Sequence, residues 1–469
     1  MRSGDLTSGP VARSVVAFAL PLLGASVVQQ LYSTVDLLFV GNALGTVATA
    51  ALGVGALLLT FLAGIFSGIA VGANVKVAHL VGARDEVGVA VGTHTSVLLG
   101  VMGGLVLAVA GEVLAEPFIS WMAVPQASAA DAVTYLRFAS AAALPMALYN
   151  ACAGVLRGLG NSRIPLVAQI AGGLLNIAAN WLALYVFQLG IAGCACATFA
   201  SNCLAAAIAC IVLMRRDSRR VGVAAADKAA VAGTTAEDGA NDNVEISELR
   251  ARSEKAHAWF DVGFAKSVLL FGLPVSAQTV AIVISNVVVQ HQVDLLGVES
   301  IAAFAIYLKV ELPIYYPILA MGQATTTFVA QNVGAENFER CRNGTRVCQW
   351  ICLGVTAVMS LVMLACGQWV FWLFDQSSDV IGIGVTMISI TFPFYVLYAV
   401  LEVQGGALRG FGHSLAPALV VLGNICVLRA VLVLTFGAFG LSIEAIAASY
   451  PITWFTTAAL MLLCRRKLI

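Results

Sequence analysis

The sequence contains few charged residues, and this scarcity excludes an ordinary soluble domain. Only 11% of its 469 residues are charged, whereas 60% are hydrophobic and the mean hydropathy is +0.92. In soluble domains about a quarter of the residues are charged. A chain of this composition is expected to be surrounded mainly by lipid.

Several catalytic motifs are also absent. The chain has no GxxxxGK[S/T] phosphate-binding loop, no HExxH zinc motif and no GxSxG nucleophile turn. Cys194 and Cys196 lack the two-residue gap of a zinc or redox pair, and no second pair follows. We therefore expect no enzyme, no cofactor and no ATP hydrolysis by a phosphate-binding loop. A polytopic membrane enzyme would need a paired nucleophile and base or metal ligands within the spans, and none is found.

Apolar runs long enough to cross about 30 Å of hydrocarbon recur along the chain. They predict an all-α polytopic membrane protein with twelve transmembrane helices, near residues 14–40, 47–75, 88–116, 131–156, 165–187, 190–214, 264–296, 301–330, 345–370, 380–408, 415–437 and 440–464. The expected domains are a first lobe at 1–214, a polar and partly disordered cytoplasmic linker at 215–262, and a second lobe at 263–469. The linker is either a spacer or, over 246–260, an amphipathic helix on the membrane surface.

Basic residues gather on one side of this topology. With a cytoplasmic N-terminus, 22 of the 25 Lys and Arg fall in cytoplasmic segments, and the exceptions are Arg137, Lys309 and Arg429. Basic residues near span ends set the orientation of membrane proteins. We expect a multi-pass protein of the cell membrane with both termini in the cytoplasm.

The two halves of the chain repeat each other. The stretch GVLRGLGNSRIP at 154–165 returns as GALRGFGHSLAP at 406–417, an offset of 252, and the same offset relates 81–83 to 333–335. Six spans per copy make the two lobes parallel, related by an axis along the membrane normal. Two such copies are the usual build of a secondary transporter.

Polar side chains in the first half predict a cation site. An ionisable group at the bilayer centre costs about 2.5–3.5 kcal/mol, so Asp36 in the first span needs a function. Carboxylate, amide and hydroxyl oxygens are hard donors that could hold Na⁺ or surround a carboxyl that exchanges a proton. The alternative for the amides and the hydroxyl is interhelical hydrogen bonding. The candidate cation ligands are Asp36, Asn176, Asn180 and Thr198, with Na⁺ assigned to the first three.

The second half contains its own intramembrane acids, each with aromatic neighbours. Tyr307 and Tyr315 lie four residues on either side of Glu311. An acid beside aromatic rings suits an organic cation, which gains from charge pairing and from the ring faces. The alternatives are that Glu311 pairs with Lys309 or Arg429, and that Glu402 lies beside Arg409. The expected substrate-binding residues are Glu311, Glu402, Tyr395, Tyr398, Tyr315 and Asn286.

At these residues the chain resembles the multidrug and toxic compound extrusion (MATE) family. The resemblance rests on TVDLLFVGNALG, VGARD, QNVGAEN, LLNIAANWL followed by GIAGCACAT, and the two LRGxG loops, in that family's order and spacing. It implies two six-helix lobes forming a V around a central cavity, and export of organic, often cationic, compounds coupled to Na⁺ or H⁺. Family members often have Asp where this chain has Asn180, which leaves Asp36 as the one carboxylate of the site.

The leading hypothesis is therefore a cation-coupled antiporter that exports drugs or toxic compounds by alternating access. The alternative is a flippase for lipid-linked saccharides in the same wider superfamily, whose phosphates would require several cavity arginines. The expected partners are small organic substrates, Na⁺ or H⁺ as the coupling ion, and the lipid bilayer. We expect no nucleic acid partner, and we expect the protein to be a monomer.

Overall fold

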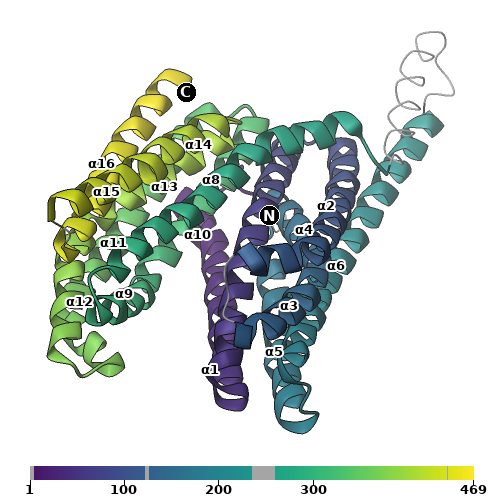
Figure 1. Ribbon diagram of the computed structural model, residues 1–469. Coiled ribbons are helices and arrows are strands. Elements are labelled where there is room, and N and C mark those ends of the chain that lie inside the picture. The colour runs from purple at the N-terminus through teal and green to yellow at the C-terminus, as the bar shows by residue number, and fades with distance from the viewer. Residues whose placement is uncertain (1–4, 122–125, 235–258, 441) are drawn as a thin grey trace. The chain divides into compact units, whose positions relative to one another are not determined.

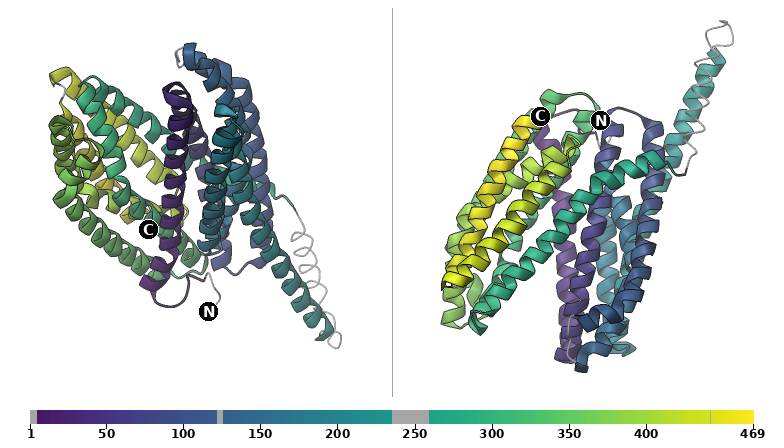
Figure 2. Two further views of the ribbon diagram at one scale, coloured as in Figure 1. Left: turned by 90° about the horizontal axis from the view of Figure 1, so that it is seen from below. Right: turned by 45° about the horizontal axis from the view of Figure 1, so that its top comes forward.

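In the computed structural model of the chain, every regular element is a helix within the described part. The structure describes residues 5–121, 126–234, 259–440 and 442–469; side chains are not described for 46–60, 62–63, 118, 121, 126–128, 131 and 217–234. Figures 1 and 2 show coiled ribbons throughout these ranges. A helix satisfies its own backbone hydrogen bonds, which lipid cannot do, so this architecture suits a chain of such low charge.

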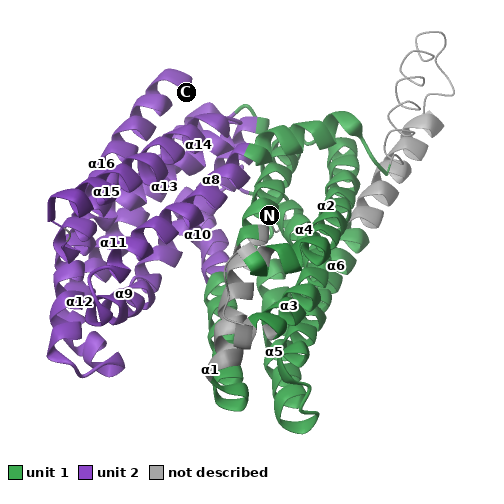
Figure 3. Ribbon diagram, in the orientation of Figure 1, with its two compact units in different colours: residues 1–5, 24–273, 334–336 green, residues 6–23, 274–333, 337–469 purple. Residues whose placement is uncertain are grey.

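The chain divides into two compact units, coloured separately in Figure 3. Unit 1 contains residues 24–273 together with 1–5 and 334–336, and unit 2 contains 6–23, 274–333 and 337–469. The elements that fall mainly in unit 1 are α1 (Val11–Gly82), α2 (Glu86–Trp121), α3 (Gln126–Ala141), α4 (Ala143–Gly158), α5 (Arg163–Trp181), the π-helix η1 (Leu182–Val186) and α6 (Gly190–Thr234).

Unit 2 has the same kind of helical composition. Its apolar core is built from residues of all its long helices and from residues near the start of the chain. The elements that fall mainly in unit 2 are α8 (Val262–Asp294), α9 (Val298–Val310), α10 (Leu312–Gly334), α11 (Phe338–Phe374), α12 (Ser378–Thr391), the 3₁₀ turn η3 (Phe392–Phe394), α13 (Tyr395–Gly410), α14 (Leu415–Val421), the π-helix η4 (Leu422–Leu428), α15 (Arg429–Gly440) and α16 (Ile443–Leu468).

The twelve predicted spans are confirmed in number and order. Ten helices of the described chain are long and apolar enough to cross a membrane, and two bent helix pairs bring the count to 12 if each pair is one span. The bends are 41° between α3 and α4 and 43° between α9 and α10. Within α1 the first two spans are separated at Gly45, whose φ of 80° favours glycine.

Two helices pass from one unit to the other at a proline. In α1 the residues up to Leu23 belong to unit 2 and those from Gly24 to unit 1, two residues after Pro21. In α8 the order is reversed, and the change occurs at Pro274 itself. Proline removes one backbone hydrogen bond and weakens a helix at that position. The two halves therefore exchange the first segments of their first helices.

The exchanged segments contribute to the core of the unit that receives them. Val15, Phe18 and Leu22 of α1 lie in the apolar core of unit 2, and Ala265 and Val268 of α8 lie in a core of unit 1. The chain ahead of α1 is fixed as well. The Leu6 amide donates to Gln331 Oε1 at 3.0 Å, and Arg340 Nη2 donates to the Ser8 carbonyl at 2.9 Å.

The connection between the halves differs in part from the prediction. The backbone of α6 continues as a helix to Thr234, twenty residues beyond the expected end of the sixth span. Residues 235–258 lie outside the described residues, and with them most of the amphipathic helix suggested for 246–260. Trp259 is described, and its ring stacks on His94 with centroids 5.1 Å apart. The domain boundaries at 214 and 263 stay predictions.

Candidate functional site

In unit 1 the candidate cation residues of α1 and α5 lie in direct contact. Asn180 Nδ2 donates a hydrogen bond to Asp36 Oδ1 at 2.6 Å and a longer one to Asn176 Oδ1 at 3.3 Å. Both asparagines are 1% exposed. Three of the four predicted ligands are thus connected by hydrogen bonds across two helices.

Two polar atoms of this cluster have no hydrogen-bond partner among the described residues. They are Oδ1 of Asn180 and Nδ2 of Asn176, and both are buried. Leaving such an atom unsatisfied costs about 1–3 kcal/mol. The unsatisfied Asn180 oxygen belongs to the amide that bonds the Asp36 carboxylate, so a cation bound there would find two oxygen ligands on neighbouring side chains.

Glycines and a tyrosine hold α5 close to its neighbours. A Cβ on Gly172 would lie 3.0 Å from the Ser201 carbonyl oxygen of α6, and one on Gly173 would lie 3.2 Å from Cδ1 of Tyr32 on α1. Gln169 Nε2 also donates to the Tyr32 hydroxyl at 3.3 Å. Tyr32 was missed by the sequence analysis, although it lies one helical turn before Asp36.

The fourth predicted ligand, Thr198, has a different partner. Its hydroxyl donates to the Cys194 carbonyl of its own helix at 3.1 Å, which leaves the oxygen lone pairs available. Cys194 and Tyr135 lie within electrostatic range of Asp36. No cluster of three His, Cys, Asp or Glu residues that could hold a metal occurs in the described chain. The oxygen donors suit a hard cation or a proton rather than a transition metal.

In unit 2, Glu311 lies at the bend between α9 and α10. Pro313 cannot donate the backbone hydrogen bond that a continuous helix requires, which explains a break at this position. Tyr395 donates its hydroxyl to Glu311 Oε2 at 2.6 Å. Tyr307, one turn earlier on α9, donates instead to Thr391 Oγ1 at 3.1 Å.

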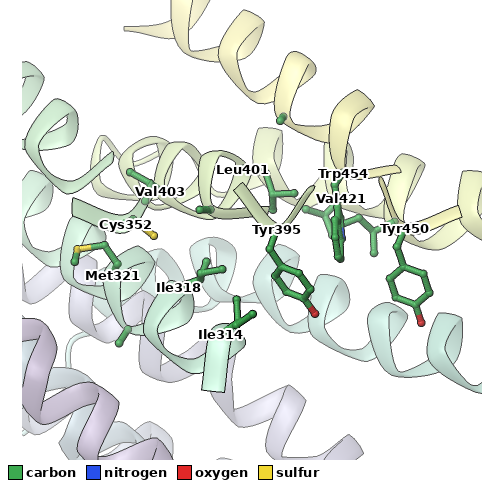
Figure 4. Close-up of a cluster of buried hydrophobic side chains, with 14 of the residues drawn as sticks. Ile314, Ile318, Met321, Cys352, Tyr395, Leu401, Val403, Val421, Tyr450 and Trp454 are labelled. Carbon is green, nitrogen blue, oxygen red and sulfur yellow. The ribbon is translucent and has the colours of Figure 1, made fainter. Parts of the chain in front are cut away.

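Aromatic rings surround this carboxylate. Tyr395 lies 4.7 Å from Trp454 and 6.2 Å from Tyr398, measured between ring centroids, and Tyr398 lies 5.7 Å from Tyr315. Figure 4 shows Tyr395, Trp454 and Tyr450 beside one another in the buried cluster. Three of the six predicted substrate residues, Tyr315, Tyr395 and Tyr398, therefore gather around a fourth, Glu311. Sequence reasoning missed Trp454, because nothing in the chain indicates that α16 packs on α13.

Arg429 is the basic residue of the same region. Its Nη2 donates to Thr453 Oγ1 at 3.0 Å, and its guanidinium carbon lies 4.2 Å from the Tyr450 ring centroid. Glu311 lies within electrostatic range of it. Arg429 begins α15 directly after η4, where the Ile425 carbonyl accepts a hydrogen bond from Ser285 at 2.9 Å. π-Helical turns are frequent at functional sites.

Glu402 lies within electrostatic range of Tyr315 and Tyr398 of this aromatic cluster, but its carboxylate is paired with another residue. Glu402 Oε1 forms an ion pair with Arg409 Nη2 at 2.8 Å, with the two side chains 13% and 10% exposed. This is the pairing weighed as the alternative for Glu402 in the sequence. Asn286 is exposed on α8.

The repeat places a different environment around the corresponding arginine of unit 1. Arg157 corresponds to Arg409, but Asn150 takes the position of Glu402 and its amide donates to the Met146 carbonyl at 2.8 Å. The Arg157 Nε is buried and has no hydrogen-bond partner among the described residues. The two LRGxG loops are alike in sequence, but within the described part of the chain only the second arginine forms an ion pair with an acid.

Comparisons with known proteins agree with this architecture. A family model described as MatE matches residues 21–182 and, a second time, residues 274–435. YoeA of Bacillus subtilis, named a probable multidrug resistance protein, is 25% identical over 414 residues, which cover 87% of this chain and 83% of the relative. NorM of Thermotoga maritima, named likewise, is 21% identical over 426 residues, with 89% and 84% covered.

Solved structures show the same fold. A MOP superfamily transporter from Pyrococcus furiosus superimposes with a TM-score of 0.84 at 21% identity, covering 100% of this chain and 98% of that chain. An outward-facing multidrug resistance MATE family transporter gives 0.82 at 20% identity, with the same coverage. The double match of one family model confirms the repeat, because its two segments begin at 21 and 274, near the two helix prolines.

Proposed function

The chain belongs to the MatE family, and from this premise we propose that it exports small organic compounds across the membrane by coupling their efflux to the entry of a cation. The family resemblance seen in the sequence is thereby established. Relatives named as multidrug resistance proteins support the direction and the substrate class. Entry of one monovalent cation yields about 2.3 kcal/mol per 100 mV, which is enough for export without ATP.

One observation carries the coupling proposal: the contact of Asp36 with Asn180 at 2.6 Å, beside an Asn180 carbonyl oxygen that has no hydrogen-bond partner among the described residues. A partly buried carboxylate held by neutral amides has unused acceptor capacity, which a cation or a proton would fill. Binding of the cation in unit 1 would then favour one state of the transport cycle, as coupled exchange by alternating access requires.

Glu311 and its aromatic neighbours support an organic cation as the substrate. A partly buried carboxylate that accepts from Tyr395, in a cluster where Tyr398 and Trp454 lie against the Tyr395 ring and Tyr315 lies against Tyr398, offers charge and π-faces together. The flippase alternative requires arginines free to hold phosphates. Arg137 is instead paired with Glu112 at 3.4 Å and Glu116 at 2.9 Å, and Arg429 is held by Thr453 and Tyr450. These contacts favour the exporter.

The test is transport in proteoliposomes that contain the full-length protein, with a Na⁺ gradient and a pH gradient imposed separately and ethidium as the probe. We expect one of the two gradients to drive ethidium transport, and this result also identifies the coupling ion. Asp36→Asn should abolish the response, whereas Glu112→Gln, which removes an exposed carboxylate elsewhere in unit 1, should retain it. The proposal would be overturned if neither gradient changed the rate of ethidium transport, or if the Asp36→Asn variant transported ethidium at the rate of the parent protein.

A further inference from the structure

A cluster of arginines without acidic partners lies at one end of unit 2. Arg342 and Arg346 are four residues apart on α11 and share a face of that helix. Arg465 of α16 lies within electrostatic range of both, and both repel its charge. Within the described chain none of the three forms an ion pair. Three guanidinium groups held together in this way leave an unbalanced positive potential.

The cluster is held in place by a hydrogen-bonded chain of side chains. Arg465 Nη1 donates to Gln404 Oε1 at 2.8 Å, and Gln404 Nε2 donates to Gln349 Oε1 at 2.8 Å. Gln404 is 3% exposed, and Gln349 lies one turn beyond Arg346 on α11. Buried amides thus fix the half-buried Arg465 beside the two arginines of α11, against their mutual repulsion.

The repeat shows that the scaffold does not need this arrangement. At the offset of 252, Val97, Cys152 and Leu213 stand in place of Gln349, Gln404 and Arg465. These three residues all contribute to an apolar core in unit 1. The arginines of α11 correspond to Ala90 and His94. Packing alone is therefore satisfied by hydrophobic residues, and the polar version in unit 2 requires another reason.

We propose that Arg342, Arg346 and Arg465 form a binding site for the headgroup of an anionic phospholipid. The arginines occur in the first turns of one span and the last turns of another, which is the headgroup level of a bilayer. Guanidinium groups bind phosphate oxygens in bidentate geometry. Trp350, one turn beyond Arg346, is 74% exposed, and Leu463 and Leu468 are 52% and 43% exposed, which provides apolar surface for acyl chains. A soluble phosphate would not use that surface.

The test is titration of the full-length protein in neutral detergent with short-chain phosphatidylglycerol, and separately with the matched phosphatidylcholine, with bound lipid counted by native mass spectrometry. Phosphatidylglycerol binds preferentially. Each of Arg342→Gln, Arg346→Gln and Arg465→Gln lowers its affinity about five-fold, and the triple variant lowers it on the order of 100-fold. Arg346→Lys keeps the charge but loses the bidentate geometry, so it lowers the affinity less than Arg346→Gln does.

The matched control is Arg466→Gln with Lys467→Gln, which removes two neighbouring charges outside the cluster and changes the affinity less than about two-fold. If the control and the triple variant lost equal affinity for phosphatidylglycerol, the lipid would be bound by nonspecific charge attraction, and the proposal would be overturned. Equal binding of phosphatidylcholine would also overturn it, as would full displacement of the lipid by inorganic phosphate. Melting temperatures within a few degrees of the parent protein exclude misfolding as the cause of lost binding. This inference does not depend on the transport proposal.

Discussion

Unit 1 holds the partly buried carboxylate of Asp36 among amides, whereas unit 2 holds the partly buried carboxylate of Glu311 beside aromatic rings. Asp36 accepts from Asn180 and Glu311 accepts from Tyr395, each at 2.6 Å. Amide oxygens suit a small hard cation, and π-faces suit a large organic one. Two copies of one scaffold thus hold their carboxylates among different side chains, at positions that do not correspond in the repeat. The difference teaches that the repeat is a property of the backbone, and that both carboxylates lie where the side chains depart from it.

The largest effect is expected where the arginine pairing differs between the units. Glu402→Gln leaves Arg409 buried without its acid, and the free energy of unfolding should fall by about 3–5 kcal/mol. The double variant Glu402→Met with Arg409→Met should recover most of this loss. Thermal unfolding of the purified protein in detergent measures both. If the Glu402→Gln variant is as stable as the parent, the ion pair does not stabilise the fold. Arg409 would then resemble its counterpart Arg157, whose copy of the repeat has Asn150 at the position of Glu402.

The next prediction separates the two carboxylates by function. Asp36→Asn should reduce gradient-driven ethidium transport by about 100-fold while leaving equilibrium ethidium binding nearly unchanged. Glu311→Gln should weaken that binding instead, because the substrate's charge loses its counterion. Fluorescence binding and proteoliposome transport, performed on both variants, check the distinction. Equal losses of ethidium binding in the two variants would contradict the assignment of coupling to Asp36 and of substrate binding to Glu311.

A smaller effect should follow from giving unit 1 a second acid. Asn180→Asp places another carboxylate beside Asp36 and should raise the apparent affinity for Na⁺ on the order of ten-fold in the Na⁺-dependent assay. Thr198→Asp serves as the comparison: the Thr198 hydroxyl bonds the Cys194 carbonyl of its own helix, so the gain in Na⁺ affinity should be smaller. A protein driven by protons alone would show no Na⁺ response in either variant.

The smallest effect is expected from the phenol of unit 2. Tyr395→Phe keeps the ring stacked on Trp454 but removes the hydrogen bond to Glu311, and ethidium affinity should fall about five-fold. Tyr307→Phe is the comparison, because the Tyr307 hydroxyl donates to Thr391 Oγ1 at 3.1 Å. A loss from Tyr307→Phe as large as that from Tyr395→Phe would indicate that the rings act through packing alone.

Much of the fold could be predicted from the sequence, because span length and hydropathy are local properties. Asn176 and Asn180 are four residues apart and therefore share one face of α5, and the packed helices bring that face to Asp36. Pro313 indicates a possible helix break near Glu311, because proline lacks a backbone N–H, but the bend was not predicted. Helical periodicity reports which residues share a face of one helix, and this part of the site follows from it.

What could not be predicted is which faces meet. Tyr32 on α1, Trp454 on α16 and the partner of Arg465 on α13 depend on contacts between helices far apart in sequence. Hydropathy carries no information on such pairs when every helix is apolar all round. Glu402 illustrates the same limit: its i+7 neighbour Arg409 was visible as an alternative, but only the packed structure decides between an ion pair and a free carboxylate.

The exchange of helix segments at Pro21 and Pro274 has a consequence for synthesis of the chain. Residues 24–234 of unit 1 emerge from the ribosome before Ala265 and Val268, which complete one of the cores of that unit. Phe18 emerges before nearly all of the unit 2 residues that it packs against. Neither half of the chain, made as a separate translation product, would contain all the residues of its unit's apolar core. A gene divided within 235–258 should therefore yield two fragments that become protease-resistant only when they are expressed together.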